Sequence, residues 1–293
     1  MKKISAAEDR LKRRRRVDRA FYFLMLGASL LVALILLLIL VTVLRKSLPA
    51  LKLSMVTKTS GAGYYLGQEG GILNAIVGSL EITLGATLLA MFLALPGIIY
   101  LNTYLKKKSL LSEVIRLVLD ILWGIPSIVF GAFGFLLMLT FRLRASLLAG
   151  MITLALVELP ILARALDETI RLVPAELREA TYAVGANRWQ TATRVVLRQA
   201  FPGLVTAVLV ALGRGLGDAA SVLFTAGYTD RLTTSLLQPV ATLPLAIFFQ
   251  LNSPFPEVQQ RAYASAAILT LLVLSLSLAA RVLTRKVARH RIK

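Results

Sequence analysis

The feature that most constrains this chain is an uninterrupted apolar stretch from Phe21 to Leu44. Its 24 residues include no charged side chain, and about 20 apolar residues are enough for a helix to cross a bilayer. A signal peptide has a shorter apolar core and a small-residue cleavage site, so we interpret this stretch as an uncleaved first span. The whole chain is 57% hydrophobic, above the roughly 45–50% of soluble domains. We therefore expect an integral membrane protein.

Five further apolar stretches predict five more spans. They cover residues 74–100, 110–140, 146–166, 204–224 and 262–283. The expected fold is an all-α membrane protein in which 1–20 is a basic N-terminal segment, 21–44 is the first span and 72–285 is a transmembrane domain with spans two to six. Residues 225–261 contain four prolines around an apolar stretch and are expected to form a long extracytoplasmic loop.

Lysine and arginine are distributed unevenly between the two sets of loops. The N-terminus, the loops 101–109 and 163–203 and the tail from Arg281 hold 24 of the 34, whereas the opposite loops hold 8. Cytoplasmic loops carry the excess of these residues. Both termini are therefore predicted in the cytoplasm of a prokaryote. The net charge of +19 reflects this topology, with the basic N-terminus facing anionic lipid, and does not indicate nucleic-acid binding.

The segment from Pro174 to Pro202 is the only long polar, helix-forming stretch between two spans. Pro174 suits the first position of a helix, and Gly185 suits the left-handed residue that ends it. Asn187 can cap a second helix, with Gln190 completing a capping box. Two short helices joined at a glycine predict a rigid cytoplasmic knob, which would dock onto another protein.

On the second helix of this knob, Trp189, Ala192 and Val196 have the i, i+3, i+7 spacing of one helical face. This spacing predicts that the three side chains share one face of the helix. Because the same helix leads into the fifth span, movement of the knob would be passed to that span.

The sequence offers no catalytic machinery of its own. It contains no Gly-x-x-x-x-Gly-Lys phosphate-binding loop, no cysteine and one histidine, His290, which we interpret as a solvated charge in the basic tail. Gly213-x-Gly215-x-Gly217 is too short for a dinucleotide fingerprint and favours close helix packing. The chain is predicted to be a non-enzymatic subunit without a cofactor or metal, so any energy must come from a partner.

Two charged residues inside the predicted fifth span allow two interpretations. Arg214 and Asp218 lie four residues apart, which would place them on one face of the fifth span. One interpretation is a self-neutralising pair that holds helices together. The other is that Arg214 lines an anion pathway with its planar guanidinium, while Asp218 holds it when no substrate is present. Glu81, in the second span, has no obvious partner.

The third and fourth spans carry further polar groups. Asp120 precedes Pro126 and Ser127, where the proline breaks the backbone ladder and the hydroxyl can satisfy a freed carbonyl. This stretch would serve either packing and bending or the pathway. Glu158 is expected either to pair with Arg164 or to line a cavity, and a cavity is equally open to Glu81.

The polar segment resembles the EAA loop of ABC-importer permeases with the MetI-like transmembrane fold. Glu179-Ala180-Thr181 precedes Gly185 at the spacing of that motif, and Val195 to Leu197 falls at the distance of its Ile-x-Leu. The third alanine of the motif is Thr181 here, and its proline is Arg198.

Further motifs resemble the PstA-type permeases of phosphate importers. They are Asn74-Ala-Ile-Val-Gly-Ser-Leu, Asp120 to Gly131, Arg171-Leu-Val-Pro, Gly185-Ala-Asn-Arg-Trp-Gln-Thr and Arg214-Gly-Leu-Gly-Asp. The chain departs from that family in two places: Asp218 replaces a glutamate, and the following Thr-Ala-Pro reads Ala219-Ala220-Ser221.

The resemblance implies a permease subunit that moves inorganic phosphate by alternating access. The implied partners are a PstC-like second permease, a pair of PstB-type ATPase subunits that bind ATP-Mg, and an extracytoplasmic phosphate-binding protein. The implied substrate pathway residues are Arg214, Asp218, Asp120 and Ser127, and the implied ATPase-coupling residues are Glu179, Ala180, Gly185, Ala186 and Trp189.

Two alternatives stay open. One is a permease for another oxyanion such as molybdate or sulfate, which uptake assays would separate. The other is a membrane scaffold or sensor that docks an ATPase without moving substrate, which predicts that Arg214 and Asp218 are dispensable.

Overall fold

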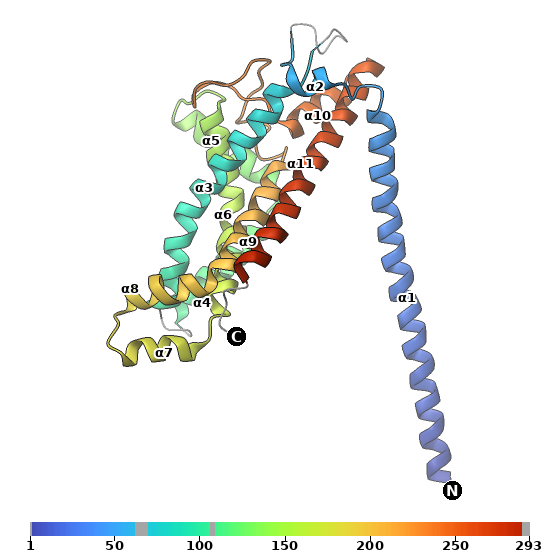
Figure 1. The fold of residues 1–293 in the computed structure, drawn as a ribbon, viewed down its shortest axis with the longest axis vertical. Coiled ribbons are helices and arrows are strands. Elements are labelled where there is room, and N and C mark those ends of the chain that lie inside the picture. Colours follow the sequence, from blue (N-terminus) through green and yellow to red (C-terminus); the bar gives the residue numbers. More distant parts are fainter. Residues whose placement is uncertain (1, 62–69, 106–108, 289–293) are drawn as a thin grey trace.

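The structure is a computed structural model that describes residues 2–61, 70–105 and 109–288. The lysine run 106–108 and His290 lie outside the described residues. Within the described part all regular elements are helices, which confirms the predicted all-α fold (Figure 1). Five of these helices are long and apolar enough to cross a membrane, and a sharply bent pair of shorter helices provides material for a sixth span.

The first helix, α1 (Lys2–Ser47), stands apart from the others (Figure 1). It contains both the basic N-terminal segment and the predicted first span, and the apolar side chains from Phe21 to Leu40 are exposed. It meets the bundle at its C-terminal end, where Lys46 Nζ donates to the hydroxyl of Tyr263 at 3.2 Å. Tyr263 belongs to the last helix, α11 (Pro256–Ala288), and the short helix α2 (Leu53–Thr57) follows α1.

The core of the bundle is built by α3 (Leu73–Thr103), α6 (Leu147–Arg171) and α9 (Leu197–Leu216). Small side chains recur at every fourth residue on the buried face of α3, namely Ala86, Ala90 and Ala94. Small residues let helix backbones approach closely, which is the main source of packing between membrane helices. Leu162 and Leu166 of α6 are fully buried in the same core.

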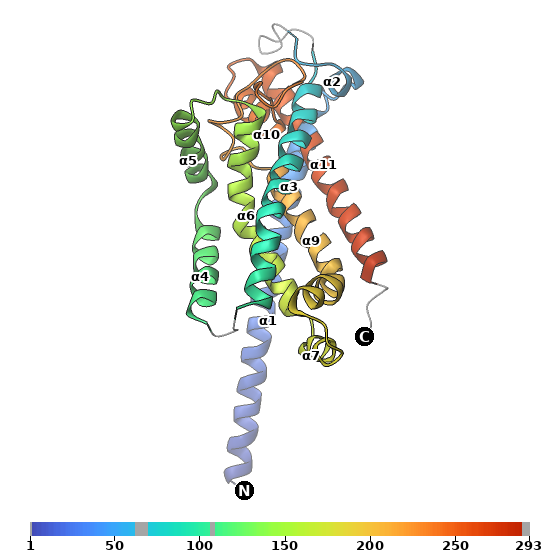
Figure 2. The same cartoon turned by 90° about the vertical axis from the view of Figure 1, so that its left-hand side faces the viewer.

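The predicted third span is not one continuous helix. It consists of α4 (Leu110–Gly124) and α5 (Ser127–Thr140), whose axes are bent by 100° at the break. Ile125 adopts an extended conformation because the ring of a following proline disfavours the helical region, and Pro126 offers no N–H to continue the helix. Both halves lie beside α6 (Figure 2).

The fifth span also differs from the prediction of 204–224. A continuous helical path begins at α8 (Arg188–Gln190), passes through a π-helical turn (Thr191–Val196) and continues as α9. Pro202 lies inside this helix and does not end it. The helix ends instead at Leu216, where turns take over. The second helix of the polar segment and the fifth span are therefore one structural unit.

The segment 225–261, predicted as a loop, contains the short helix α10 (Leu243–Leu251), and α11 begins within it at Pro256. The apolar stretch noted in the sequence is this helix. Its first residue is held by α3, because the N–H of Leu243 donates to Ser79 Oγ at 2.7 Å.

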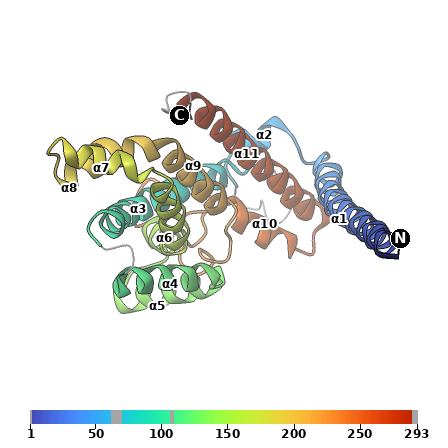
Figure 3. The same cartoon turned by 90° about the horizontal axis from the view of Figure 1, so that it is seen from below.

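The molecule has two distinct ends. The helix α7 (Ala175–Ala183) and α8 lie at one end of the bundle, and α2 and α10 lie at the other (Figure 1). We refer to these as the α7 end and the α10 end. Seen along the bundle, α7 and α8 project from one side and α1 from the opposite side (Figure 3).

Candidate functional site

The two helices of the polar segment form the predicted projecting knob. α7 ends before Gly185, which has a left-handed backbone with φ of 84°. The side chain of Asn187 accepts from the N–H of Gln190 at 2.8 Å, and the N–H of Asn187 donates to Gln190 Oε1 at 3.0 Å. Both the left-handed glycine and the capping box predicted from the sequence are confirmed.

The outer surface of this knob carries exposed apolar side chains beside charged ones. Its exposed apolar side chains include Tyr182, Val184 and Trp189, with Val184 at 83% and Trp189 at 59% exposed. Glu179 and Ala180 are also exposed and Ala186 is half-buried. Exposed apolar surface on a projecting element is typical of a protein-binding site.

One local expectation about the knob is wrong. Ala192 and Val196 are buried, but Trp189 is exposed and does not share their face. The cause is the π-helical turn, because its i→i+5 hydrogen bonds put more residues in each turn and rotate the following side chains away from α-helical spacing. Trp189 is thereby left available to a partner.

A buried ionic network lies where α7 meets the bundle, and sequence reasoning did not identify it. Asp167 of α6 is fully buried and accepts from Asn102 Nδ2 of α3 at 2.7 Å and from Arg116 Nε of α4 at 2.9 Å. Arg116 also donates to Ser112 Oγ at 2.6 Å. Three helices of the bundle are thus joined through one carboxylate.

Arg178 connects α7 to this network. Its Nη1 donates to the carbonyl of Asn102 at 3.3 Å, and its Nη2 donates to the carbonyl of Ile170 at 3.0 Å. A cavity of about 710 Å³, lined in part by Arg116 and Glu179, separates the rest of α7 from the bundle. Arg178 is therefore the direct tie from the knob to the ends of α3 and α6. We call Arg116, Asn102, Asp167 and Arg178 the Asp167 network.

Arg214 and Asp218 do not form the predicted pair on one helical face. Arg214 lies in the last turn of α9 with an exposed side chain, and it makes no ion pair with another described residue. Asp218 lies beyond the helix end, where its Oδ1 accepts from the N–H of Ser221 at 2.9 Å. The helix ends early because Gly215 and Gly217 are poor helix formers and the Asp218 carboxylate stabilises the following turn.

Glu158 of α6 lies against the end of α9, next to Gly215. Its carboxylate is fully buried, and Oε2 accepts from Thr87 Oγ1 at 2.7 Å. The predicted ion pair of Glu158 with Arg164 does not form, because residues six apart lie on different faces of a helix. The other carboxylate oxygen of Glu158, Oε1, lies against Gly215 of α9 instead.

Asp120 and Ser127 stand on either side of the α4–α5 break. Asp120 Oδ1 accepts from Arg164 Nε at 3.3 Å, so its partner is on α6. The Ser127 hydroxyl makes no hydrogen bond to another described residue, and its expected bond to a freed carbonyl is not formed. One turn further along α5, Gly131 packs against the carbonyls of Ala220 and Ser221. The face of α5 that carries Ser127 therefore runs along the turn that follows Asp218.

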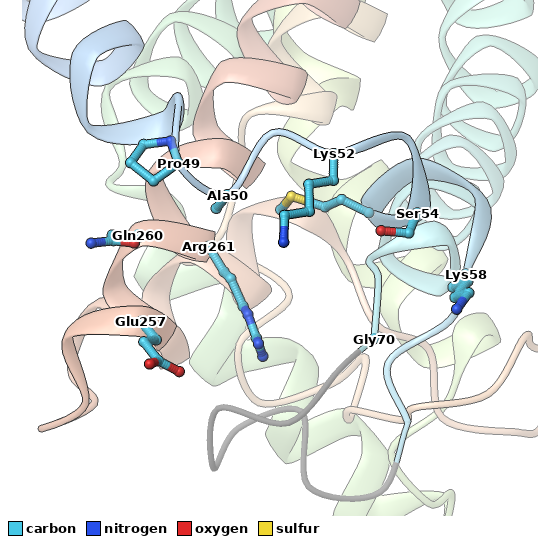
Figure 4. A pocket seen from close by; sticks show the side chains of 10 residues that line it. Pro49, Ala50, Lys52, Ser54, Lys58, Gly70, Glu257, Gln260 and Arg261 are labelled. Atoms are coloured by element: carbon cyan, nitrogen blue, oxygen red, sulfur yellow. The ribbon is translucent and has the colours of Figure 1, made fainter.

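A second cavity lies at the α10 end, between the α1–α2 connection and the start of α11. It has a volume of about 430 Å³, and its charged lining residues are Lys52, Lys58, Glu257 and Arg261. The side chains of Lys52 and Arg261 extend toward the same space (Figure 4). Sequence reasoning singled out none of these residues. In the described parts of the chain, no group of three or more His, Asp or Glu side chains is placed to hold a metal ion.

Comparison with solved structures places this arrangement in a known fold. A structure described as an inward-facing conformation of the MetNI methionine ABC transporter has a TM-score of 0.59 at 20% identity, and covers 73% of this chain and 95% of that chain. An amino acid ABC transporter with histidines has a TM-score of 0.54 at 17% identity over 73% of this chain and 92% of that chain. At these identities the likeness establishes the fold.

Sequence comparison establishes the family. The profile described as "Binding-protein-dependent transport system inner membrane component" matches residues 86–291. Phosphate transport system permease protein PstA from Yersinia pestis is 36% identical, covering 93% of this chain and 92% of that protein. PstA from Xylella fastidiosa (strain Temecula1) is 37% identical, covering 95% of this chain and 96% of that protein. This multi-pass membrane protein therefore belongs to the family of binding-protein-dependent transport system inner membrane components, among the PstA-type permeases.

Proposed function

We propose that this chain is the permease subunit of an ATP-driven importer that moves inorganic phosphate across the cytoplasmic membrane by alternating access. The observation that carries the proposal is Arg214, a guanidinium at the end of an apolar helix without an ion-pair partner among the described residues. An arginine inside a membrane span costs roughly 2.5–3.5 kcal/mol on insertion scales, so its presence there indicates a functional role. The relatives named as phosphate transport permeases supply the substrate.

The proposed pathway passes Arg214 and the turn that follows α9. A planar guanidinium offers two parallel N–H donors, which match two oxygens of a phosphate ion. Asp218 sits beside this position and would disfavour a second anion. The α5 face carrying Ser127 supports a role on the same pathway, whereas Asp120 is engaged by Arg164 and would act by holding α4 to α6.

The proposed lever is the knob. Its exposed surface around Glu179, Ala180, Ala186 and Trp189 would dock on an ATPase, with Gly185 setting the angle between its helices. Movement of α8 would reach Arg214 directly, because α8 and α9 are continuous. Movement of α7 would reach α3, α4 and α6 through the Asp167 network.

The proposed assembly places both termini and the α7 end in the cytoplasm, in agreement with the distribution of lysine and arginine. A PstC-like permease would complete the membrane part, and two PstB-type ATPase subunits would hold ATP-Mg below the knobs. A phosphate-binding protein would deliver its ligand at the α10 end. This chain would contribute no catalytic residue to ATP hydrolysis.

The test is phosphate uptake by the reconstituted complex with Arg214→Gln. Glutamine keeps a polar side chain but loses the charge and the paired donors, so uptake is expected to be lost while the complex still assembles and binds ATP. Arg281→Gln is a matched control, since it removes an arginine from α11 near the α7 end. Full uptake by R214Q would favour the scaffold alternative. Uptake of molybdate or sulfate by the wild-type complex, without uptake of phosphate, would favour a permease for another oxyanion.

A further inference from the structure

Two buried polar atoms without hydrogen-bond partners lie close together in the centre of the bundle. They are Oε1 of Glu158 on α6 and Oγ1 of Thr83 on α3. Both residues are almost completely inaccessible to solvent. Buried polar atoms of this kind are normally satisfied, so an open acceptor on a carboxylate calls for a partner that it meets in another state.

The open oxygen of Glu158 faces α9. A Cβ atom at Gly215 would overlap Glu158 Oε1 and would lie 2.9 Å from Thr83 Cγ2. The absence of a side chain at Gly215 therefore allows the carboxylate to touch the helix. Oε2 is already engaged by Thr87, so it is Oε1 that is directed at α9.

The neighbour of Gly215 in the chain is Arg214, which lacks an ion pair among the described residues. Asp218, which the sequence offered as its resting partner, uses Oδ1 to hold the turn at Ser221. Glu158 remains as the carboxylate that has an open acceptor oxygen, and that oxygen lies against Gly215, the residue that follows Arg214.

We infer that Glu158 is the resting partner of Arg214: as phosphate leaves, the guanidinium passes from the phosphate to Oε1 of Glu158. The inference rests on the proposed role of Arg214 in the pathway and assigns a positioning residue to it. Phosphate and Glu158 would compete for one cation, which allows a tightly held anion to be released toward the cytoplasm.

The connection of α9 to the knob provides the movement. Successive side chains of a helix are about 100° apart, so a partial turn of α9 combined with the reach of an arginine brings Arg214 toward the position that Gly215 occupies. α9 ends within two residues of Arg214 at one end and is continuous with α8 at the other. A rotation applied to α8 by an ATPase would therefore move Arg214 relative to Glu158.

The test is the kinetics of phosphate uptake by the full complex carrying Glu158→Gln. Glutamine has the same shape and can still meet Thr87, but it carries no charge to draw Arg214 from phosphate. The maximal uptake rate and the KM for phosphate are both expected to fall, by about tenfold each, because phosphate is retained. A purely structural role would lower the rate without lowering KM.

Glu81→Gln is the matched control. It makes the same chemical change on α3, and its carboxylate also has an open buried oxygen, but the side-chain atoms nearest the Cβ position of Gly215 belong to Glu158 and Thr83. E81Q is expected to keep the wild-type KM. Glu158→Asp restores the charge on a shorter side chain and is expected to bring KM back toward the wild-type value, which also covers the case in which E158Q fails to assemble.

The outcomes separate this inference from the proposed function. Wild-type KM and rate in E158Q, or identical behaviour of E158Q and E81Q, would overturn the role of Glu158. If E158Q behaves like the wild type but R214Q does not transport phosphate, the pathway role of Arg214 survives. If R214Q transports normally, the proposed function fails first and Glu158 loses its partner with it.

Discussion

Arg178 on α7 donates to the carbonyl of Ile170 at the end of α6, at 3.0 Å. The same guanidinium donates to the carbonyl of Asn102 at the end of α3. Two core helices are therefore held by one side chain of the knob. Because these bonds go to backbone atoms, movement of α7 must displace the helices themselves and not only their side chains.

Replacement of Arg178 by alanine should uncouple the transporter. Hydrogen bonds from a charged donor are worth about 1.5–3 kcal/mol each, and two of them are lost. We expect ATP hydrolysis to continue while phosphate uptake per ATP falls several-fold in proteoliposomes. Arg188→Ala is the control, because this arginine is exposed on α8 and makes no contact with those carbonyls. Equal uptake per ATP in both variants would remove Arg178 from the coupling route.

Asp167→Asn should destabilise the fold. The Asp167 side chain is fully buried and that of Arg116 is 18% exposed, so the change leaves a largely buried guanidinium without its counter-charge. Breaking such a pair costs about 3–5 kcal/mol. A clear drop in the thermal unfolding midpoint of the detergent-purified complex is expected.

Glu168→Gln is the control for that measurement. Glu168 pairs with Arg164 at 3.3 Å, but its side chain is 63% exposed, and an exposed pair is worth at most about 1 kcal/mol. An equal loss of stability in both variants would show that burial of the Asp167 network is not what matters.

Gly185→Val should disturb the angle between α7 and α8 without a steric clash. No atom lies within 4 Å of a Cβ placed there, so the cost arises from the backbone, whose φ is 84°. A β-branched residue in this conformation costs roughly 1–3 kcal/mol. ATP hydrolysis is expected to lose its link to uptake, whereas Gly185→Asn, which tolerates this conformation, should stay close to wild type. Normal coupling in the valine variant would contradict a fixed knob.

Trp189→Ala should weaken docking of the ATPase and leave the permease folded. Trp189 is 59% exposed, so its removal takes little packing from the chain. Tryptophans at the centre of an interface often contribute 2 kcal/mol or more, which corresponds to a loss of about thirtyfold in affinity. Trp123, the other tryptophan of the chain, is 53% exposed on α4, and W123A serves as the control in a pull-down with the ATPase. Retention of the ATPase by W189A would place its docking site elsewhere.

The parts of this structure that were predictable depend on local chemistry. Gly185 and the capping box of Asn187 and Gln190 act within a few residues of one another, so their geometry follows from the sequence. The pairing of Arg116 with Asp167 joins residues 51 apart on different helices, and no local pattern indicates it. Both residues are charges in apolar helices, and such charges are the sequence signal that could have suggested a buried ion pair.

The wrong predictions share a physical cause. Arg214 with Asp218, and Trp189 with Val196, were placed by counting along an ideal α-helix. The glycines after Arg214 end that helix, and the π-helical turn after Gln190 changes its period. Pro126 was recognised as a break, but the 100° between α4 and α5 depends on how both halves pack against α6. Helix ends and irregular turns, which concentrate near the candidate site, are where counting fails.

The most direct test of the central claim is ATP hydrolysis by the complete complex in nanodiscs, measured with the phosphate-binding protein added empty or loaded with phosphate. Stimulation by the phosphate-loaded protein, well above that by the empty protein or by the loaded protein with an R214Q permease, is the predicted result. Absence of stimulation with phosphate, together with stimulation when the same complex is offered a binding protein loaded with molybdate or sulfate, would contradict the account.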